Sequence, residues 1–574
     1  MNRDQTLSAR EIEGLIAKGS TIVIFEDFVL RLDSWLGRHP GGSLAIEHMI
    51  GRDATDEISA YHSLETCKTM KAFRIGRKPA GPWINMTPPI RGGVFTPYDV
   101  VQEEKPAVAD ADAASKIDSD GALLLPEDKE GDKEKLLRRR RTPSPAAAAA
   151  FSPNKENVTV PDRSSDDDEA WHVDGYPLCP EKYTDWAVQQ EIDQGLATYP
   201  ALDAATQQDI VAKYRNLHQQ IRDEGLYECR YIEYGKEMAR YSTLFALFLT
   251  ALRYEWWMTS AVFLGLFWHQ IMFTAHDAGH RAITKNFVVD TLIGMFVADF
   301  CCGLSIGWWK SSHNVHHLIT NQPEHDPDIQ NVPLFATCPS FFKSINSSYY
   351  NGFVFVWDKA AEILVPYQQY TYYPVMGIAR FNLYLLSWLH VLSGKGSSLG
   401  SSKAWWIRPT EITFMACYWF IFGYCLLLRT LPTWTVRVAF VLVCHIITMP
   451  LHVQITLSHW GMSTSDLGEA ESFPQRQLRT TMDVDCPAWL DFIHGGLQFQ
   501  AIHHLFPRVP RHNLRRTQEL VKEFSRETGI PYLTLNFLDG NKKVLSRLEE
   551  VSKQVKILVS CQKYMAETGE SGLH

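Results

Sequence analysis

The hydropathy pattern divides the chain into three parts. The first 240 residues are mostly polar and charged, residues 241 to about 460 carry the long apolar runs, and the remainder returns to charged, amphipathic segments. A helix that spans a bilayer needs about 20 mainly apolar residues. The pattern therefore predicts a membrane-embedded centre between two polar ends.

Four spans are predicted, arranged as two hairpins. Short turns with aromatic and basic residues, at 253–257 and 429–434, separate the members of each pair and are typical of a membrane interface. The predicted spans are 241–252 with its flanks, 256–275, 412–428 and 436–457.

Three histidine clusters flank these apolar segments. His276 and His280 are i and i+4, and His313, His316 and His317 are i, i+3 and i+4, so on a helix each of these two sets projects from one face. Imidazoles without thiolates suit Fe, Zn, Cu or Ni. A lone histidine is more often a hydrogen-bonded core residue, but several clusters at ligand spacing beside hydrocarbon favour a metal site. The clusters are His276 with His280, His313 with His316 and His317, and His503 with His504.

One metal site can use all three clusters only if they lie on the same face of the bilayer. If residues 288–309 crossed the membrane completely, lipid would separate the first cluster from the second. We therefore predict that 288–309 is re-entrant or interfacial, and that 376–392 is an interfacial helix. All clusters and both termini then lie on one side, which we expect to be cytosolic.

The first 80 residues have the pattern of a small soluble domain. Ser8 and Glu11 predict a helix-capping box, and residues 21–25 predict a short strand. His39 precedes Pro-Gly-Gly, which favours a rigid turn with close backbone approach, and His62 follows 23 residues later. Two such histidines can face each other across a flat cofactor.

Composition sets the other boundaries. Blocks of opposite charge with little apolar periodicity predict a disordered linker, and charged amphipathic helices are predicted between it and the first span. The predicted segments are a small soluble domain at 1–82, a linker at 83–175, amphipathic helices at 176–240, a membrane domain at 241–530 and a C-terminal cytosolic tail at 531–574.

Charge and cysteine usage exclude several classes of protein. A net charge of −9 over 574 residues argues against a nucleic-acid binder. The eleven cysteines include no Cys-x-x-Cys pair, which argues against a zinc ribbon or a disulfide scaffold and predicts reduced thiols. The N-terminus lacks the apolar core of a signal peptide, so we expect internal spans to direct membrane insertion.

The His39-Pro-Gly-Gly motif, with Asp53-Ala-Thr and His62 downstream, resembles the cytochrome b5 haem-binding domain over about residues 5–80. The resemblance implies an α+β domain in which His39 and His62 are the axial ligands of a b-type haem that transfers single electrons.

The spacings His-x3-His, His-x2-His-His and Gln-x2-His-His resemble the histidine boxes of membrane fatty acyl and lipid desaturases over about residues 230–530. Gln500 in place of the first histidine of the third box marks the front-end branch, whose members carry an N-terminal cytochrome b5 domain. The implied fold is an all-α integral membrane domain with four transmembrane helices and a cytosolic histidine-rich cap. The resemblance implies two non-haem Fe ions held by His276, His280, His313, His316, His317, His459, His503 and His504, with Gln500 as a ligand or a supporting residue.

Residues 495–513 and the long charged linker look most like the fungal sphingolipid Δ8 desaturases. This implies insertion of a double bond at C8 of the long-chain base of a ceramide, with O2 as co-substrate, in the endoplasmic reticulum membrane. Because no Gly-x-Gly-x-x-Gly fingerprint opens a βαβ unit, NADH is expected to act through a separate cytochrome b5 reductase.

Three alternative functions remain open from the sequence. A front-end fatty acyl desaturase acting at Δ5 or Δ6 has nearly the same signature. A lipid hydroxylase has similar boxes but usually carries histidine where Gln500 stands. A non-enzymatic haem electron carrier or receptor would bind haem without non-haem iron.

Overall fold

The structure, a computed structural model, describes residues 3–86, 172–173, 176–177, 179–350, 352–393, 404–468 and 470–568. Apart from residues 172–173 and 176, the described residues belong to one compact unit. The linker predicted at 83–175 lies almost wholly outside the described residues. Strands β4 (His172–Val173) and β5 (Tyr176–Pro177) pair with each other.

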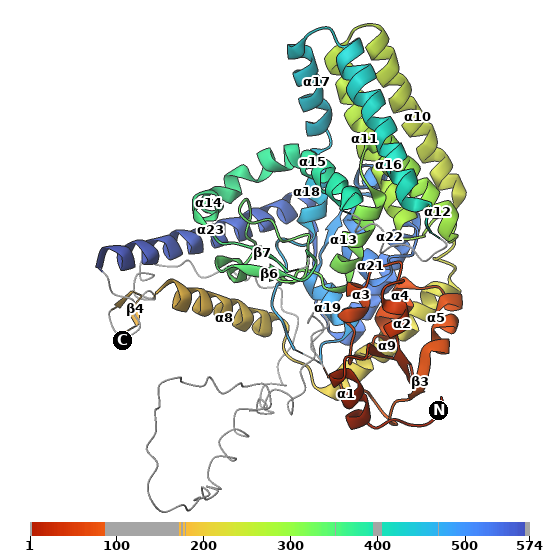
Figure 1. Cartoon of the computed structure of the whole chain (residues 1–574), viewed down its shortest axis with the longest axis vertical. Coiled ribbons are helices and arrows are strands. Elements are labelled where there is room, and N and C mark those ends of the chain that lie inside the picture. Colours follow the sequence, from red (N-terminus) through yellow and green to blue (C-terminus); the bar gives the residue numbers. More distant parts are fainter. Residues whose placement is uncertain are drawn as a thin grey trace, which may run out of the picture. The chain divides into compact units, whose positions relative to one another are not determined.

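The N-terminal domain is a three-stranded sheet surrounded by short helices (Figure 1). The antiparallel strands run in the order β1 (Ile22–Phe25), β2 (Phe28–Arg31) and β3 (Arg74–Arg77), and β1 is the strand predicted from the sequence. The predicted capping box is present: Ser8 Oγ accepts the Glu11 N–H at 3.3 Å, and the Glu11 carboxylate accepts the Ser8 N–H at 2.7 Å. The helices are α1 (Ala9–Ala17), α2 (Asp33–Leu36), α3 (Leu44–Glu47), α4 (Thr55–Tyr61), α5 (Leu64–Met70) and η1 (Lys71–Phe73).

Among the described residues, four helical stretches are long and apolar enough to span a membrane. Three of them correspond to predicted spans. The predicted turn at 253–257 precedes the first of these three, and the predicted turn at 429–434 lies between the second and the third. These three are α11 (Trp257–Gly279), α16 (Ile407–Tyr418) with its π-helical continuation η8 (Trp419–Thr430), and α17 (Trp434–Ile446) with α18 (Met449–Leu457).

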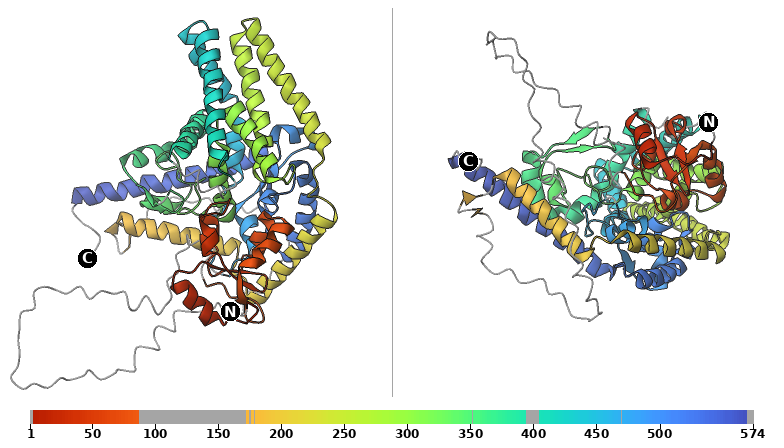
Figure 2. Two further views of the ribbon diagram at one scale, coloured as in Figure 1. Left: turned by 45° about the vertical axis from the view of Figure 1, so that its right-hand side comes forward. Right: turned by 90° about the horizontal axis from the view of Figure 1, so that it is seen from below.

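The fourth stretch differs from the sequence prediction. Length and hydropathy select Lys359–Leu392 rather than α10 (Tyr231–Arg253), because the first half of α10 is rich in charged residues. The apolar segment predicted to be an interfacial helix at 376–392 is the second half of this longer stretch. Figures 1 and 2 show α10 upright beside α11, whereas α15 runs obliquely across the lower ends of the upright helices. The stretch consists of α14 (Lys359–Leu364), η6 (Val365–Tyr367) and α15 (Gln368–Leu392).

The segment that follows α11 is sharply bent rather than one straight helix. Helix α12 (Phe287–Met295) and the π-helical turn η4 (Phe296–Cys301) are bent by 115° relative to α13 (Ile306–Leu318). Glycine is required at the break, because Gly303 has a φ of +70° and an added Cβ would lie 2.3 Å from the Tyr418 ring. The prediction that 288–309 is not a straight span is confirmed.

Buried carboxylates satisfy the backbone groups that this break frees. Asp299 accepts the Ile306 N–H at 2.8 Å. Glu411, which is 1% exposed, accepts the Gly307 N–H at 2.7 Å and the Ser305 hydroxyl at 2.9 Å. Non-helical backbone at membrane depth requires such internal partners.

Two pairs of packed helices and several short elements complete the fold. Helix α9 packs on α22, and α8 packs on α23, which fills the segment predicted as a C-terminal tail. Contacts such as Gln368 Nε2 to the Leu548 carbonyl, at 3.0 Å, tie α23 to α15. The elements are α8 (Pro180–Thr198), α9 (Ala204–Asp223), η5 (Pro339–Phe342), β6 (Ile345–Ser347), β7 (Phe353–Phe355), α19 (Phe473–Thr480), β8 (Asp483–Asp485), η9 (Ala488–Leu490), α20 (Asp491–His494), η10 (Leu497–Phe499), α21 (Gln500–Leu505), η11 (Arg511–Asn513), α22 (Leu514–Thr528), β9 (Thr534–Asn536) and α23 (Phe537–Thr568).

Replacing Glu411 tests the role of the buried carboxylate at the break. Glu411→Ala leaves the Gly307 N–H and the Ser305 hydroxyl without their acceptor, and each buried donor left unpaired costs about 1–3 kcal/mol. We expect a lower thermal unfolding midpoint for the detergent-purified protein. Glu411→Gln, which keeps an acceptor oxygen, is the control and should lose less; equal losses would contradict this role.

Candidate metal centre and haem pocket

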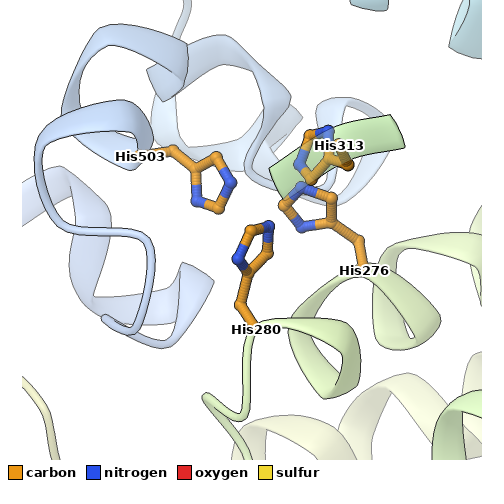
Figure 3. Close-up of side chains that lie close together, drawn as sticks. All are labelled: His276, His280, His313 and His503. Carbon is orange, nitrogen blue, oxygen red and sulfur yellow. The ribbon is translucent and has the colours of Figure 1, made fainter. Parts of the chain in front are cut away.

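The fold brings the histidine clusters together. His276 and His280 project from the C-terminal end of α11, His313 comes from α13 and His503 from α21 (Figure 3). One ring nitrogen from each of these four lies within 4.8 Å of the others. The arrangement matches a site for one metal ion.

A second group lies beside the first. His316 of α13, His459 just after α18 and His504 of α21 also place one ring nitrogen each within 4.8 Å of one another. His317 lies between the groups: its ring stacks on His504 with centroids 4.1 Å apart, and its Nε2 is 2.9 Å from His313 Nε2. All eight histidines named from the sequence therefore converge on one place.

The ring nitrogens have the properties expected of metal ligands. Burial lowers the pKa of His459, His503 and His504 well below the ordinary value, so the neutral, ligating form is favoured. Six buried ring nitrogens of the eight clustered histidines have no hydrogen-bond partner among the described residues, which fits atoms directed at metal ions. They are Nε2 of His276, His280, His459, His503 and His504, and Nδ1 of His317.

Polar side chains hold the ligand rings from behind. Asp326 is fully buried, and its carboxylate lies 2.9 Å from His316 Nδ1. Burial lowers the pKa of His316, but Asp326 and Asp328 outweigh it and raise that pKa to about 9. On the other side of the centre, Gln477 Oε1 lies 3.0 Å from His504 Nδ1. Such partners fix the orientation of an imidazole and increase its basicity as a ligand.

These supporting residues were not predicted from the sequence. Asp326 had a usable signal, since a carboxylate soon after a histidine box is a suitable partner for a ligand ring. Gln477 had none, because it lies 27 residues before His504 in an otherwise ordinary polar helix. Arg511 was also missed: its Nη1 donates to Asp277 at 3.1 Å and anchors the helix end that carries His276.

Gln500 begins α21 one turn before His503 and His504, so the three side chains share a helix face. Its side chain is 3% exposed, and Oε1 has no hydrogen-bond partner within the described parts of the chain. A buried carbonyl oxygen in this position can accept from a ligand or face a metal ion.

His39 and His62 face each other in the N-terminal domain. Their ring centroids are 6.0 Å apart, which leaves room for one flat group between them. His39 Nδ1 lies 2.8 Å from the Gly42 carbonyl, and His62 Nδ1 lies 3.0 Å from the Ile58 carbonyl. Both Nδ1 atoms are therefore donors, which leaves each Nε2 bare for a metal. Burial lowers the pKa of both histidines, that of His62 to about 3.

The cavity between these rings has a volume of about 340 Å³ and a mostly apolar lining. Residues of the helical domain, including His280, Lys310 and Asn314, close one side of it. A volume of this size and character fits a bound planar cofactor.

Two ion pairs fix α4 of the N-terminal domain to the helical domain. Arg215 Nε is 2.7 Å from Asp56, and Arg476 Nη2 is 3.2 Å from Glu57. Arg476 is fully buried and Glu57 is 5% exposed, so this pair is shielded from solvent. The pair of His39 and His62 and the histidine clusters are thereby held next to each other.

The sequence matches two families. Residues 255–536 match the fatty acid desaturase family, and residues 8–78 match the cytochrome b5-like haem/steroid binding domain. Together with the four candidate membrane helices among the described residues, these matches confirm the predicted fold class.

Two fungal relatives resemble nearly the whole chain, and a plant relative resembles a shorter part of it. A Delta 8-(E)-sphingolipid desaturase of Emericella nidulans is 48% identical over 572 residues, covering 100% of this chain and 99% of the relative. One from Kluyveromyces lactis is 46% identical over 564 residues, covering 98% and 95%. A Delta(8)-fatty-acid desaturase of Helianthus annuus is 35% identical over 361 residues, covering 61% and 76%.

Asp326→Ala tests the support of His316. Loss of the carboxylate frees the ring to rotate, and loss of such a partner typically costs about 10- to 100-fold in metal affinity or activity. We expect less non-haem metal per chain with unchanged haem. The control is Asp328→Ala, because that carboxylate is farther from the same nitrogen, at 3.8 Å. Metal content equal to that of the unmodified protein in Asp326→Ala would contradict the assignment.

Proposed function

Because the chain belongs to the family of cytochrome b5-fused sphingolipid Δ8 desaturases, we propose that it inserts a double bond at C8 of the long-chain base of a ceramide. The new bond is E, as in the names of the fungal relatives. The observation that carries the proposal is the convergence of eight histidines beside a second histidine pair suited to haem.

The ligand assignment follows from the two groups of ring nitrogens. One iron is held by His276, His280, His313 and His503, the other by His316, His459 and His504, and His317 completes the set between them. Gln500 supports the set from the start of α21. His39 and His62 hold a b-type haem through their bare Nε2 atoms.

Bound iron would supply the O2 activation needed to remove hydrogen from two unactivated methylenes. The overall reaction consumes one O2, two electrons and two protons, and converts CH2–CH2 into CH=CH with two waters released. Haem carries one electron at a time, so the N-terminal domain delivers two electrons in succession. We propose that they come from NADH through cytochrome b5 reductase.

The chain's own residues prepare the site for this chemistry. The backs of the His316 and His504 rings are fixed by Asp326 and Gln477. Burial keeps the histidines of the third cluster neutral and limits access of bulk water. The N-terminal domain contacts the histidine-bearing side of the helical domain. We propose that this side, which carries the clustered histidines and the pair of His39 and His62, faces the cytosol. The protein is then a multi-pass protein of the endoplasmic reticulum membrane with both termini cytosolic.

A front-end fatty acyl lipid desaturase is the second candidate, favoured by the name of the Helianthus annuus relative, a Delta(8)-fatty-acid desaturase. The two candidates differ in whether the double bond forms in the long-chain base or in a lipid-bound fatty acid. Hydroxylation would instead add oxygen to the product.

Lipid analysis of a host that lacks C8 unsaturation tests the proposal. Expression of the chain should produce long-chain bases with an E double bond at C8, detected by mass spectrometry after hydrolysis of ceramides. His503→Ala is the inactive control, because it removes a proposed ligand. Unsaturation confined to acyl chains would select the second candidate, and oxygenated products would select a hydroxylase.

His39→Ala separates the haem from the iron centre. Loss of an axial ligand should abolish haem binding and product formation, while non-haem iron stays at about two per chain. Absorbance spectra and metal analysis of the purified protein measure these quantities. Arg38→Ala changes an exposed neighbour and should retain both cofactors. Normal turnover by His39→Ala would show that a separate cytochrome b5 is sufficient.

A further inference from the structure

Tyr61 lies between the proposed haem and the proposed iron centre. It is the last residue of α4 and directly precedes His62, the proposed axial ligand. Its ring meets the His317 ring edge-on, with centroids 6.0 Å apart and planes at 84°. One side chain of the N-terminal domain therefore contacts a histidine of the catalytic cluster.

We propose that Tyr61 is the bridge through which electrons pass from the haem to the iron centre. This rests on the function proposed above. In each transfer, ferrous haem becomes ferric and the iron centre gains one electron, and two transfers serve one double bond. The electron tunnels through the Tyr61 side chain, and Tyr61 is itself neither oxidised nor reduced overall.

The route through Tyr61 is short in bonds and contacts. An electron leaving the His62 ring passes along one stretch of main chain to the neighbouring Tyr61 side chain. A single ring contact then leads to His317. Electron tunnelling weakens steeply with distance and more steeply across empty space than through bonded or packed atoms. A packed aromatic ring at position 61 therefore supports faster electron tunnelling than a shorter aliphatic side chain would.

The position of Tyr61 is fixed from both sides. Glu57 lies one turn before Tyr61 on the same face of α4, and its ion pair with Arg476 anchors that face. Arg476 belongs to α19, and the next residue, Gln477, donates its amide to the His317 carbonyl at 2.8 Å. The same helix therefore holds the bridge and the histidine that the bridge contacts.

Electron transfer through Tyr61 depends on its ring and not on its hydroxyl. The hydroxyl is buried without a hydrogen-bond partner among the described residues, so it makes no identified connection to the centre. The cavity offers one competing route, because Gly279, His280 and Arg281 also line it. Electrons entering there would bypass Tyr61.

Single-turnover kinetics of the full-length holoenzyme distinguish the two routes. The haem is reduced anaerobically with one equivalent of dithionite and then mixed with ceramide and O2, and its reoxidation is followed by stopped-flow absorbance. Tyr61→Leu should slow reoxidation by about tenfold, equivalent to about 1.4 kcal/mol in activation free energy. Tyr61→Phe should restore a rate close to that of the unmodified protein.

Further readouts separate a bridge from a structural role. Haem midpoint potential, haem spectrum and non-haem iron content should be the same in Tyr61→Leu and the unmodified protein. Reoxidation rates are normalised to the haem present, and Tyr61→Met provides a second non-aromatic variant of similar length. Phe28→Leu is the matched control, since it removes an aromatic ring of β2 that is not among the residues lining the cavity between His39 and His62.

Each outcome has one interpretation. If the unmodified protein does not reoxidise its haem in a ceramide-dependent way, the proposed function fails. If it does so and Tyr61→Leu and Tyr61→Met match its rate at equal potential, electrons enter through the 279–281 turn and the bridge is wrong. Slow reoxidation in both variants with rescue by Tyr61→Phe supports the bridge.

Discussion

The break between η4 and α13 is the constraint on which the rest of the structure depends. Because the chain bends by 115° there, the α13 histidines meet the end of α11, where the His276 and His313 ring centroids are 5.3 Å apart. The break is possible because Glu411 and Asp299 accept the backbone N–H groups that it frees. A membrane-embedded chain thus uses buried carboxylates to build a turn, and the turn assembles the metal site.

Many imidazoles in one buried place would be costly without a purpose. Their unpartnered ring nitrogens lose hydration on burial, a penalty that metal coordination can offset. The supporting contacts also matter, because Asp326 and Gln477 hold ligand rings in one orientation. The same helix that provides Gln477 provides Arg476, so the metal centre and the attachment of the N-terminal domain share one structural element. Docking of that domain and geometry of the centre are therefore coupled through α19.

The haem pocket is completed by both domains, which has a consequence for electron delivery. Lys310 and Asn314 of α13 cover one side of the cavity that His39 and His62 define. A group held between these two histidines would therefore lie against α13, the helix that also carries His313, His316 and His317. Fusion of the domains favours repeated docking, since an attached partner is present at high effective concentration.

The sequence by itself determined the chemistry, because ligand spacing and a haem motif are local properties of the chain. It also indicated three of the four candidate spans, and the bend within 288–309, since lipid cannot separate ligands of one site. It did not reveal that α14 and α15 form one long apolar stretch, or that α23 packs as a helix. Contacts such as Glu57 with Arg476 and Tyr61 with His317 were decided only by tertiary packing. These residues lie hundreds of positions apart, and no periodicity or motif links them.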